Sequence, residues 1–160
     1  MIRAMMGGWA VLGTMLVATL GHAQPPGLAG LEGVWVGRLE TSYGQVDRVL
    51  QKDGMSLPLR LMLVPYVRWQ ISKCEMKIEL KGGGAAVVEV SGSDSIHVES
   101  DKPTWTARQI DQDRFEVTIV GQNEPHIWQA ELRNEGNTLM VSGDSWQSSP
   151  FQVTRFERKQ

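Results

Sequence analysis

Side chains that bind metals or act as nucleophiles are few in this chain, and they are not grouped. His97 and His126 fall on different predicted strands, and neither has another histidine, a cysteine or a carboxylate at the spacing of a zinc site. We expect no metal site and a hydrated or capped His97. Cys74 is the sole cysteine, so no intrachain disulfide can form. We expect it to be a small buried apolar residue; an intermolecular bridge or a reactive thiol is the alternative.

Acidic residues form two close pairs of the kind that general acid–base catalysis uses. Glu99 and Asp101 are one pair, and Asp111 and Asp113 are the other. Both pairs fall at predicted strand ends, where carboxylates cap turns and stay hydrated. No nucleophile elbow, zinc-protease helix or dinucleotide fingerprint occurs, and the glycine triplet at 82–84 leads into a strand instead of a phosphate-binding helix. The sequence therefore predicts a protein that is not an enzyme and needs no cofactor.

Tryptophan is frequent in the part of the chain that we expect to fold, which contains Trp35, Trp69, Trp105, Trp128 and Trp146. Indoles on several strands of a barrel can line a cavity for a small apolar molecule. Trp69 and Trp128 are the main candidates for such a lining, together with Trp105. The alternative is that the indoles only fill a small barrel whose interior holds nothing but side chains.

A residue period of two dominates the chain after its first thirty residues, and helical periodicity is nearly absent. The segment 74–81 shows this best, with apolar residues at even positions and Glu or Lys at odd positions. Pro58 restricts the start of one further strand to an edge or a strand end. We predict strands over residues 34–40, 56–64, 67–72, 74–81, 85–90, 95–99, 104–110, 115–119, 128–133, 138–142 and 151–157.

The secondary structure of the segment 43–51 has two interpretations, a short helix and a strand. Val46, Val49 and Leu50 suit one or two helical turns, whereas Val46, Arg48 and Leu50 suit a strand that leads to the turn at Asp53. We favour the strand.

Turn residues separate these segments every 8 to 12 positions, as in Asp53-Gly54 and the glycine triplet at 82–84. This spacing is typical of an antiparallel up-and-down meander. A meander of this length must curl or close to protect its edges. We therefore predict an all-β fold in which the meander closes into a barrel.

The two ends of the chain resemble those of lipocalin-like barrels. Residues 31–39 contain a Gly-x-Trp at Gly33-Val34-Trp35, and residues 139–155 are similar to the last two strands of small bacterial secreted barrels of that kind. The resemblance implies that Trp35 plugs one end of the barrel and that Arg155 or Arg158 stacks its guanidinium on the indole, with Arg155 as the closing arginine. This role is structural and implies no activity.

A fainter resemblance is to the small periplasmic inhibitors of bacterial metalloproteases. These barrels also follow a signal peptide and carry an early Gly-x-Trp and a cysteine before a strand, which Cys74 would match here. The second cysteine of that family is missing from this chain.

Residues 1–23 have the features of a secretory signal peptide. Arg3 supplies positive charge, residues 8–20 are largely apolar, and small residues precede a cut after Ala23. An uncleaved membrane anchor is the alternative, but two prolines directly after the cut and the small residues in the apolar run favour cleavage. We expect a periplasmic or secreted protein.

The chain that follows the cut is long enough for one hydrophobic core. We expect a flexible leader at residues 24–30, a single domain at 31–160 and no stable membrane insertion after cleavage. The full chain carries 16 basic and 18 acidic residues, a balance that favours neither nucleic acid nor an anionic membrane as partner.

These features predict an exported, non-enzymatic binding or accessory protein that holds a small hydrophobic molecule in a lipocalin-like barrel. The alternative is a periplasmic protein-interaction module, such as a protease inhibitor, which binds an envelope protein through its leader or an exposed strand edge.

Overall fold

A computed structural model describes residues 26–92, 102–121, 124–143, 146–147 and 149–160. The predicted signal peptide lies outside these residues, as do His97 and the predicted strand 95–99. The elements are η1 (Pro26–Leu31), β1 (Gly33–Arg38), α2 (Tyr43–Lys52), α3 (Leu57–Ile71), β2 (Glu75–Leu80), β3 (Ala86–Ser91), β4 (Thr104–Gln109), β5 (Arg114–Val120), β6 (His126–Arg133), β7 (Thr138–Ser142) and β8 (Arg155–Arg158).

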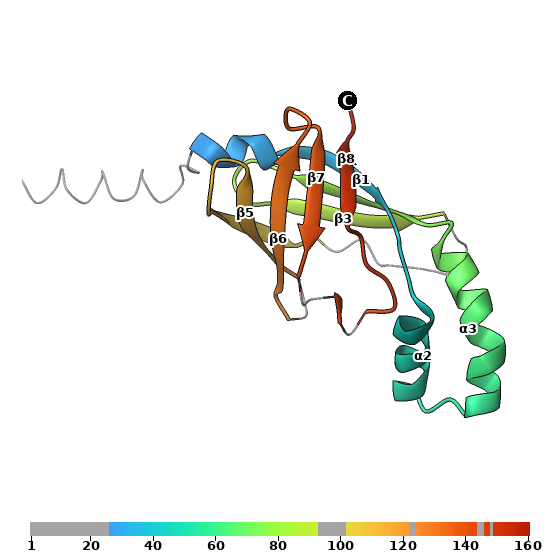
Figure 1. Ribbon diagram of the computed structural model, residues 1–160. Helices are drawn as coiled ribbons and strands as arrows, with labels where there is room; N and C mark the ends of the chain where they lie inside the picture. The colour runs from blue at the N-terminus through green and yellow to red at the C-terminus, as the bar shows by residue number, and fades with distance from the viewer. Residues whose placement is uncertain (1–25, 93–101, 122–123, 144–145, 148) are drawn as a thin grey trace, which may run out of the picture.

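Within the described residues, eight strands form one sheet in the order β3-β2-β1-β8-β7-β6-β5-β4, and all neighbours are antiparallel. The last strand lies beside the first, and Trp35 pairs with Arg158. The sheet curls into a half-barrel (Figure 1). Its two edges approach at one end, where Ala86 N donates to Pro103 O at 2.9 Å and Trp105 N donates to Gly84 O at 2.7 Å. The predicted antiparallel meander is confirmed.

Alternation along the strands separates the two faces of the sheet. In β2, the side chains of Met76, Ile78 and Leu80 are buried, and in β5 those of Phe115, Val117 and Ile119 are buried. Side chains between them face water or are partly covered. The concave side of the half-barrel is therefore filled by one core, whose largest fully buried side chains are Trp35, Trp105, Phe115, Phe156 and Leu31.

The predicted strands 56–64 and 67–72 are wrong, because this part of the chain is the single helix α3. Pro58 stands in the first helical turn, where its missing N–H is not required for an intrahelical bond. The leucines at alternate positions resemble a strand pattern only because α3 is apolar on nearly all sides. The fold is consequently not all-β but mostly β, with two α-helices in the described residues.

The open segment 43–51 is also helical, so the favoured strand is wrong there as well. A capping box begins α2: the Ser42 hydroxyl accepts from Gln45 N at 3.2 Å, and the Gln45 side chain accepts from Ser42 N at 2.9 Å. Such a reciprocal pair satisfies two N–H groups that the first helical turn leaves unpaired.

Candidate functional site

In the sequence, α2 and α3 lie between β1 and β2. They form a helical hairpin that projects from one end of the half-barrel (Figure 1). Val46 of α2 and Val64 and Ile71 of α3 are buried, which fixes the inner side of the hairpin. Arg60 Nε donates to Asp47 Oδ1 at 2.8 Å, and only 14% of the Arg60 side chain is exposed. The two helices are thus held together by an apolar contact and a partly buried ion pair.

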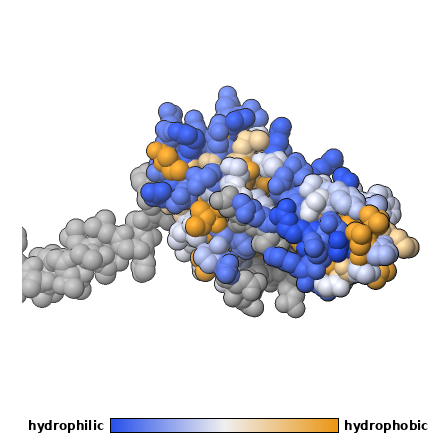
Figure 2. Space-filling view, turned by 60° about the horizontal axis from the view of Figure 1, so that its bottom comes forward, coloured by the Kyte–Doolittle hydropathy of each residue, from blue (hydrophilic) through white to orange (hydrophobic). Residues whose placement is uncertain are grey.

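The outer side of α3 is an exposed apolar face. At 100° per residue, Met62, Tyr66 and Trp69 follow one another along one stripe, and their exposed fractions are 76%, 50% and 53%. Leu59 and Leu61 lie on the two sides of this stripe, and Leu57 is exposed at the N-terminal end of α3; each is more than half exposed. We call these six residues the apolar face. In Figure 2, apolar atoms gather at the end of the molecule to the right, where Figure 1 places α3.

The size of the apolar face sets it apart from ordinary surface leucines. Large apolar side chains have roughly 150–250 Å² each, so six that are at least half exposed present on the order of 600 Å² together. The largest apolar patch on a typical monomer is about 300–600 Å² and is often functional, and one partner contributes roughly 800 Å² to a standard interface. The face is therefore large enough to be a docking surface.

Basic residues outnumber acidic residues in the hairpin. Residues 43–73 hold five of the 16 basic residues of the chain but only two of its 18 acidic residues. Asp47 is paired with Arg60, and Lys73 Nζ lies 3.2 Å from the centroid of the Trp69 ring. The hairpin is thus locally positive although the whole chain has an excess of acid.

The three tryptophans predicted to line a cavity lie in different places. Trp69 is on the outside of α3 and not in the half-barrel. Trp105 is 1% exposed and donates from Nε1 to Lys81 O at 2.9 Å, near the place where the sheet edges approach. Trp128 lies inside the half-barrel and is 7% exposed. The structure therefore does not bring these three residues together.

Trp128 belongs to an aromatic cluster that sequence reasoning did not assemble. Its ring stacks on Trp146 with centroids 5.5 Å apart and packs on Phe156 at 6.3 Å, and Phe151 extends the cluster from Trp146. The Nε1 atoms of Trp128 and Trp146 are buried and have no hydrogen-bond partner among the described residues. A buried N–H that is left unpaired costs about 1–3 kcal/mol, so buried N–H groups generally have an acceptor, which can be an ordered water or a bound molecule.

At the opposite side of the core, Arg158 and not Arg155 lies over Trp35. The Arg158 guanidinium is 4.3 Å from the Trp35 ring centroid and donates to Glu32 O at 2.6 Å, Gly30 O at 2.5 Å and Gly136 O at 3.0 Å. Arg155 is exposed and pairs with Glu157 at 2.6 Å. Strand parity explains the difference, because residues 156 and 158 point inward together.

Gly33 of the Gly-x-Trp lies next to the Arg158 guanidinium that packs on Trp35. Its φ is +124°, and a Cβ there would lie 2.7 Å from Nη1 of Arg158. Trp35 Nε1 donates to Leu31 O at 2.8 Å, which ties the indole to the end of η1. The motif is therefore explained by the packing of one arginine on one indole.

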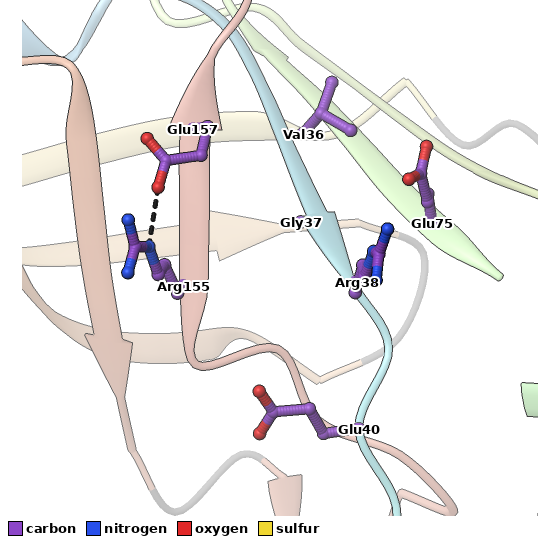
Figure 3. A pocket seen from close by; sticks show the side chains of 7 residues that line it. All are labelled: Val36, Gly37, Arg38, Glu40, Glu75, Arg155 and Glu157. Carbon is purple, nitrogen blue, oxygen red and sulfur yellow. Dashed lines mark hydrogen bonds and ion pairs between the residues drawn. The ribbon is translucent and has the colours of Figure 1, made fainter. Parts of the chain in front are cut away.

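The outer face of the sheet carries a shallow depression of about 420 Å³ over β1, β2 and β8 (Figure 3). Charged side chains line it, with the Arg155–Glu157 ion pair along one side. Arg155 and the Thr138 hydroxyl donate to Glu157 and lower the pKa of its carboxyl. A carboxylate held in its ionised form by an exposed ion pair is a poor proton donor, so nothing here suggests acid–base catalysis.

The other titratable candidates lie in different parts of the structure. Asp111 is ion-paired with Arg114, which lowers the pKa of Asp111. Burial raises the pKa of the Cys74 thiol, which donates to Gln70 O at 3.4 Å. His126 is exposed at the start of β6. No group of three metal-ligating side chains occurs in the part of the chain that the structure describes.

No known family model matches this chain, and no curated protein matches it. Among the described residues, the helices are too short or too polar to cross a bilayer. Two features of the structure bear on function: the apolar face of α3 and the aromatic cluster around Trp128. The sequence holds one signal for the apolar face of α3. No charge occurs between Arg60 and Arg68, and Pro58 shortly before them suits a helix start.

Proposed function

We propose that this chain is an exported, non-enzymatic accessory protein that docks to another component of the cell envelope through the apolar face of α3. The half-barrel acts as a rigid carrier for the hairpin. The observation that carries the proposal is the set of six exposed apolar side chains on α3, among which Met62, with 76% exposed, is the most exposed. A helix that is apolar on nearly all sides is usually covered by protein or lipid.

The energetics favour a covered state. Burial of apolar surface contributes about 25 cal/mol per Å², so covering on the order of 600 Å² releases roughly 15 kcal/mol before the entropic cost of association, which is estimated at 4–15 kcal/mol. A useful affinity therefore remains within reach of this face alone. The proposed compartment is periplasmic or extracellular, as the signal-like segment at residues 1–23 suggests.

We also propose that the half-barrel is of the lipocalin-like kind. The arrangement of Gly33, Trp35 and Arg158 supports this proposal, because the resemblance implies a first-strand Gly-x-Trp with an arginine on the indole. The adjacency of the first and last strands supports it as well.

Fractionation of cells that export the full chain tests the docking proposal. The native protein should elute or sediment with a larger assembly or with membranes. The double variant Leu61→Glu/Met62→Glu should be recovered as a free monomer. The double variant Ile110→Glu/Val120→Glu adds the same charge at exposed apolar positions of the sheet and should behave as the native protein does. A native chain found as a free monomer, or equal behaviour of both variants, would contradict the proposal.

A second candidate function is the binding of a small hydrophobic molecule within the half-barrel. The buried indole N–H groups of Trp128 and Trp146 support it, because they have no acceptor among the described residues and a guest with a hydrogen-bond acceptor would satisfy them. Mass spectrometry of an organic extract of the exported protein should then detect a guest. The variant Trp128→Phe/Trp146→Phe should lose this guest, and Trp69→Phe should keep it because Trp69 lies outside. Extracts without a guest would argue against this function.

A further inference from the structure

The charge and aromatic content of the hairpin point to what covers α3. We propose that the apolar face of α3 lies on an anionic phospholipid membrane surface, parallel to its plane. This inference rests on the proposed docking function and names the surface involved. It is a statement about adsorption to the interface and not about a membrane-spanning segment.

The face has the composition of an interfacial helix. Its exposed arc, from Leu61 through Met62 to Leu59, carries no charge, because Arg60 is turned inward to Asp47. Interfacial helices bury such a face by about 5–10 Å among headgroups and acyl chains while the opposite side stays polar or covered. Here the opposite side is covered by α2.

Aromatic and basic side chains flank the apolar residues at the C-terminal end of α3. Tyr66 and Trp69 lie with ring centroids 6.1 Å apart, both about half exposed, and Lys73 lies over the Trp69 ring. Tyr and Trp are enriched at the level of lipid headgroups, and lysine extends its charged end toward phosphate while its stem covers apolar surface. This order of residues suits a helix at the boundary between hydrocarbon and headgroups.

The charge of the hairpin complements an anionic surface. Once Asp47 is neutralised by Arg60, four basic residues of the hairpin remain against Asp53. Arg68 lies on α3 and Lys73 lies directly after it, over the Trp69 ring. Arg48 and Lys52 belong to α2, and Arg48 donates to Gln147 O at 2.9 Å. The other parts of the chain hold 16 of the 18 acidic residues, and the hairpin lies at one end of the molecule (Figure 1). The acidic half-barrel can therefore face away from the membrane, so the acidic excess of the whole chain does not prevent the contact.

The same charges disfavour a second copy of this chain as the occupant. In a twofold dimer through α3, two positive hairpins would be brought face to face, and like charges across an interface are repulsive. A planar membrane brings no second positive hairpin to this face, and the hairpin projects from one end of the half-barrel (Figure 1).

Co-sedimentation with vesicles tests the proposal. The protein is purified after export, and its mass is used to verify that the cut before Gln24 has occurred. Vesicles contain phosphatidylcholine alone or a 3:1 mixture with phosphatidylglycerol. We expect binding to the mixed vesicles that weakens in high salt, and quenching of Trp69 by brominated acyl chains, judged against Trp69→Phe.

Three variants separate the contributions. Leu61→Glu/Met62→Glu should reduce partitioning at least tenfold. Arg68→Gln should reduce it about fivefold on mixed vesicles and leave pure phosphatidylcholine unaffected. Ile110→Glu/Val120→Glu is the control with the same added charge and should reduce partitioning less than twofold. Circular dichroism of each variant verifies that the helices and strands are retained.

Two results would overturn the inference in different ways. In the first, the native protein binds neither kind of vesicle but is an oligomer by light scattering, and Leu61→Glu/Met62→Glu dissociates the oligomer. The apolar face is then covered by protein, and the docking function stands without the membrane. In the second, the native protein binds no vesicles and fractionates as a free monomer; both the inference and the proposed function are then wrong.

Discussion

Removal of the Arg158 guanidinium should destabilise the fold far more than removal of Arg155, although both arginines lie on β8. Arg158 donates to three backbone carbonyls and stacks on Trp35, whereas Arg155 has one ion pair with Glu157 in which both side chains are more than half exposed. The two residues are a matched pair, because the same substitution removes the same side chain from the same strand.

The expected magnitude follows from these contacts. A hydrogen bond to a charged group contributes about 1.5–3 kcal/mol and a cation–π contact about 0.5–2 kcal/mol. Partial exposure and non-additivity reduce the total, so Arg158→Ala should lower the free energy of unfolding by about 2–4 kcal/mol. Arg158→Lys keeps the charge but not the planar fork and should cost about half as much. Arg155→Ala should cost less than about 0.5 kcal/mol, as exposed ion pairs do.

Urea denaturation followed by tryptophan fluorescence measures these differences. With a denaturant slope of about 1–3 kcal/mol per molar urea, Arg158→Ala should lower the midpoint by roughly 1–2 M while Arg155→Ala leaves it nearly unchanged. Equal midpoints for the two alanine variants would refute the reasoning that Arg158 joins η1, β1 and β8. A changed slope would indicate a change in the surface exposed on unfolding and would call for comparison at a second probe.

Three further predictions concern single side chains. Gly33→Ala should destabilise the protein by about 1–3 kcal/mol, because side chains other than glycine rarely adopt a φ of +124° and the new Cβ would displace the Arg158 guanidinium; a neutral effect in urea melts would contradict this. Cys74 should react with iodoacetamide at least a hundredfold faster in denaturant than in the native state, since its thiol is buried with a raised pKa. The folded-state pKa of Glu157 is lowered, so its stabilisation should be present at neutral pH and should decrease as the pH falls below the ordinary glutamate value of 4.5. Glu157→Gln should therefore be less stable than the native protein at pH 7, and the difference should shrink as the pH is lowered below 4.5. A difference that does not change with pH would argue against the ion pair.

Period-two patterning predicted most of the sheet because strand alternation is a local property. Each of β2, β4, β5, β6 and β7 lies where apolar residues alternate with polar ones, within one or two residues of the predicted limits. The predicted strand 151–157 was only partly right, because pairing in β8 is limited to Arg155–Arg158. Gln152 instead forms an isolated bridge with Glu40.

The error over α3 has a physical reason. A helix that is apolar on most of its sides shows no 3.6-residue pattern, and its leucines at 57, 59, 61 and 63 therefore match a period of two equally well. The alternation rule assumes that one side of a segment faces water and the other faces the core. On α3 that assumption is wrong, because leucines on its outer side have no covering element in the described structure.

The amino-acid pattern alone was sufficient to establish the antiparallel strands, the Gly-x-Trp at Gly33 and the absence of a recognisable catalytic motif. Each of these follows from neighbouring residues, whose environments alternate over a few ångströms. The choice of Arg158 over Arg155, the aromatic cluster around Trp128 and the apolar face of α3 required the folded chain. They depend on which distant surfaces meet and which stay uncovered, and a pattern of local polarity carries no information about either.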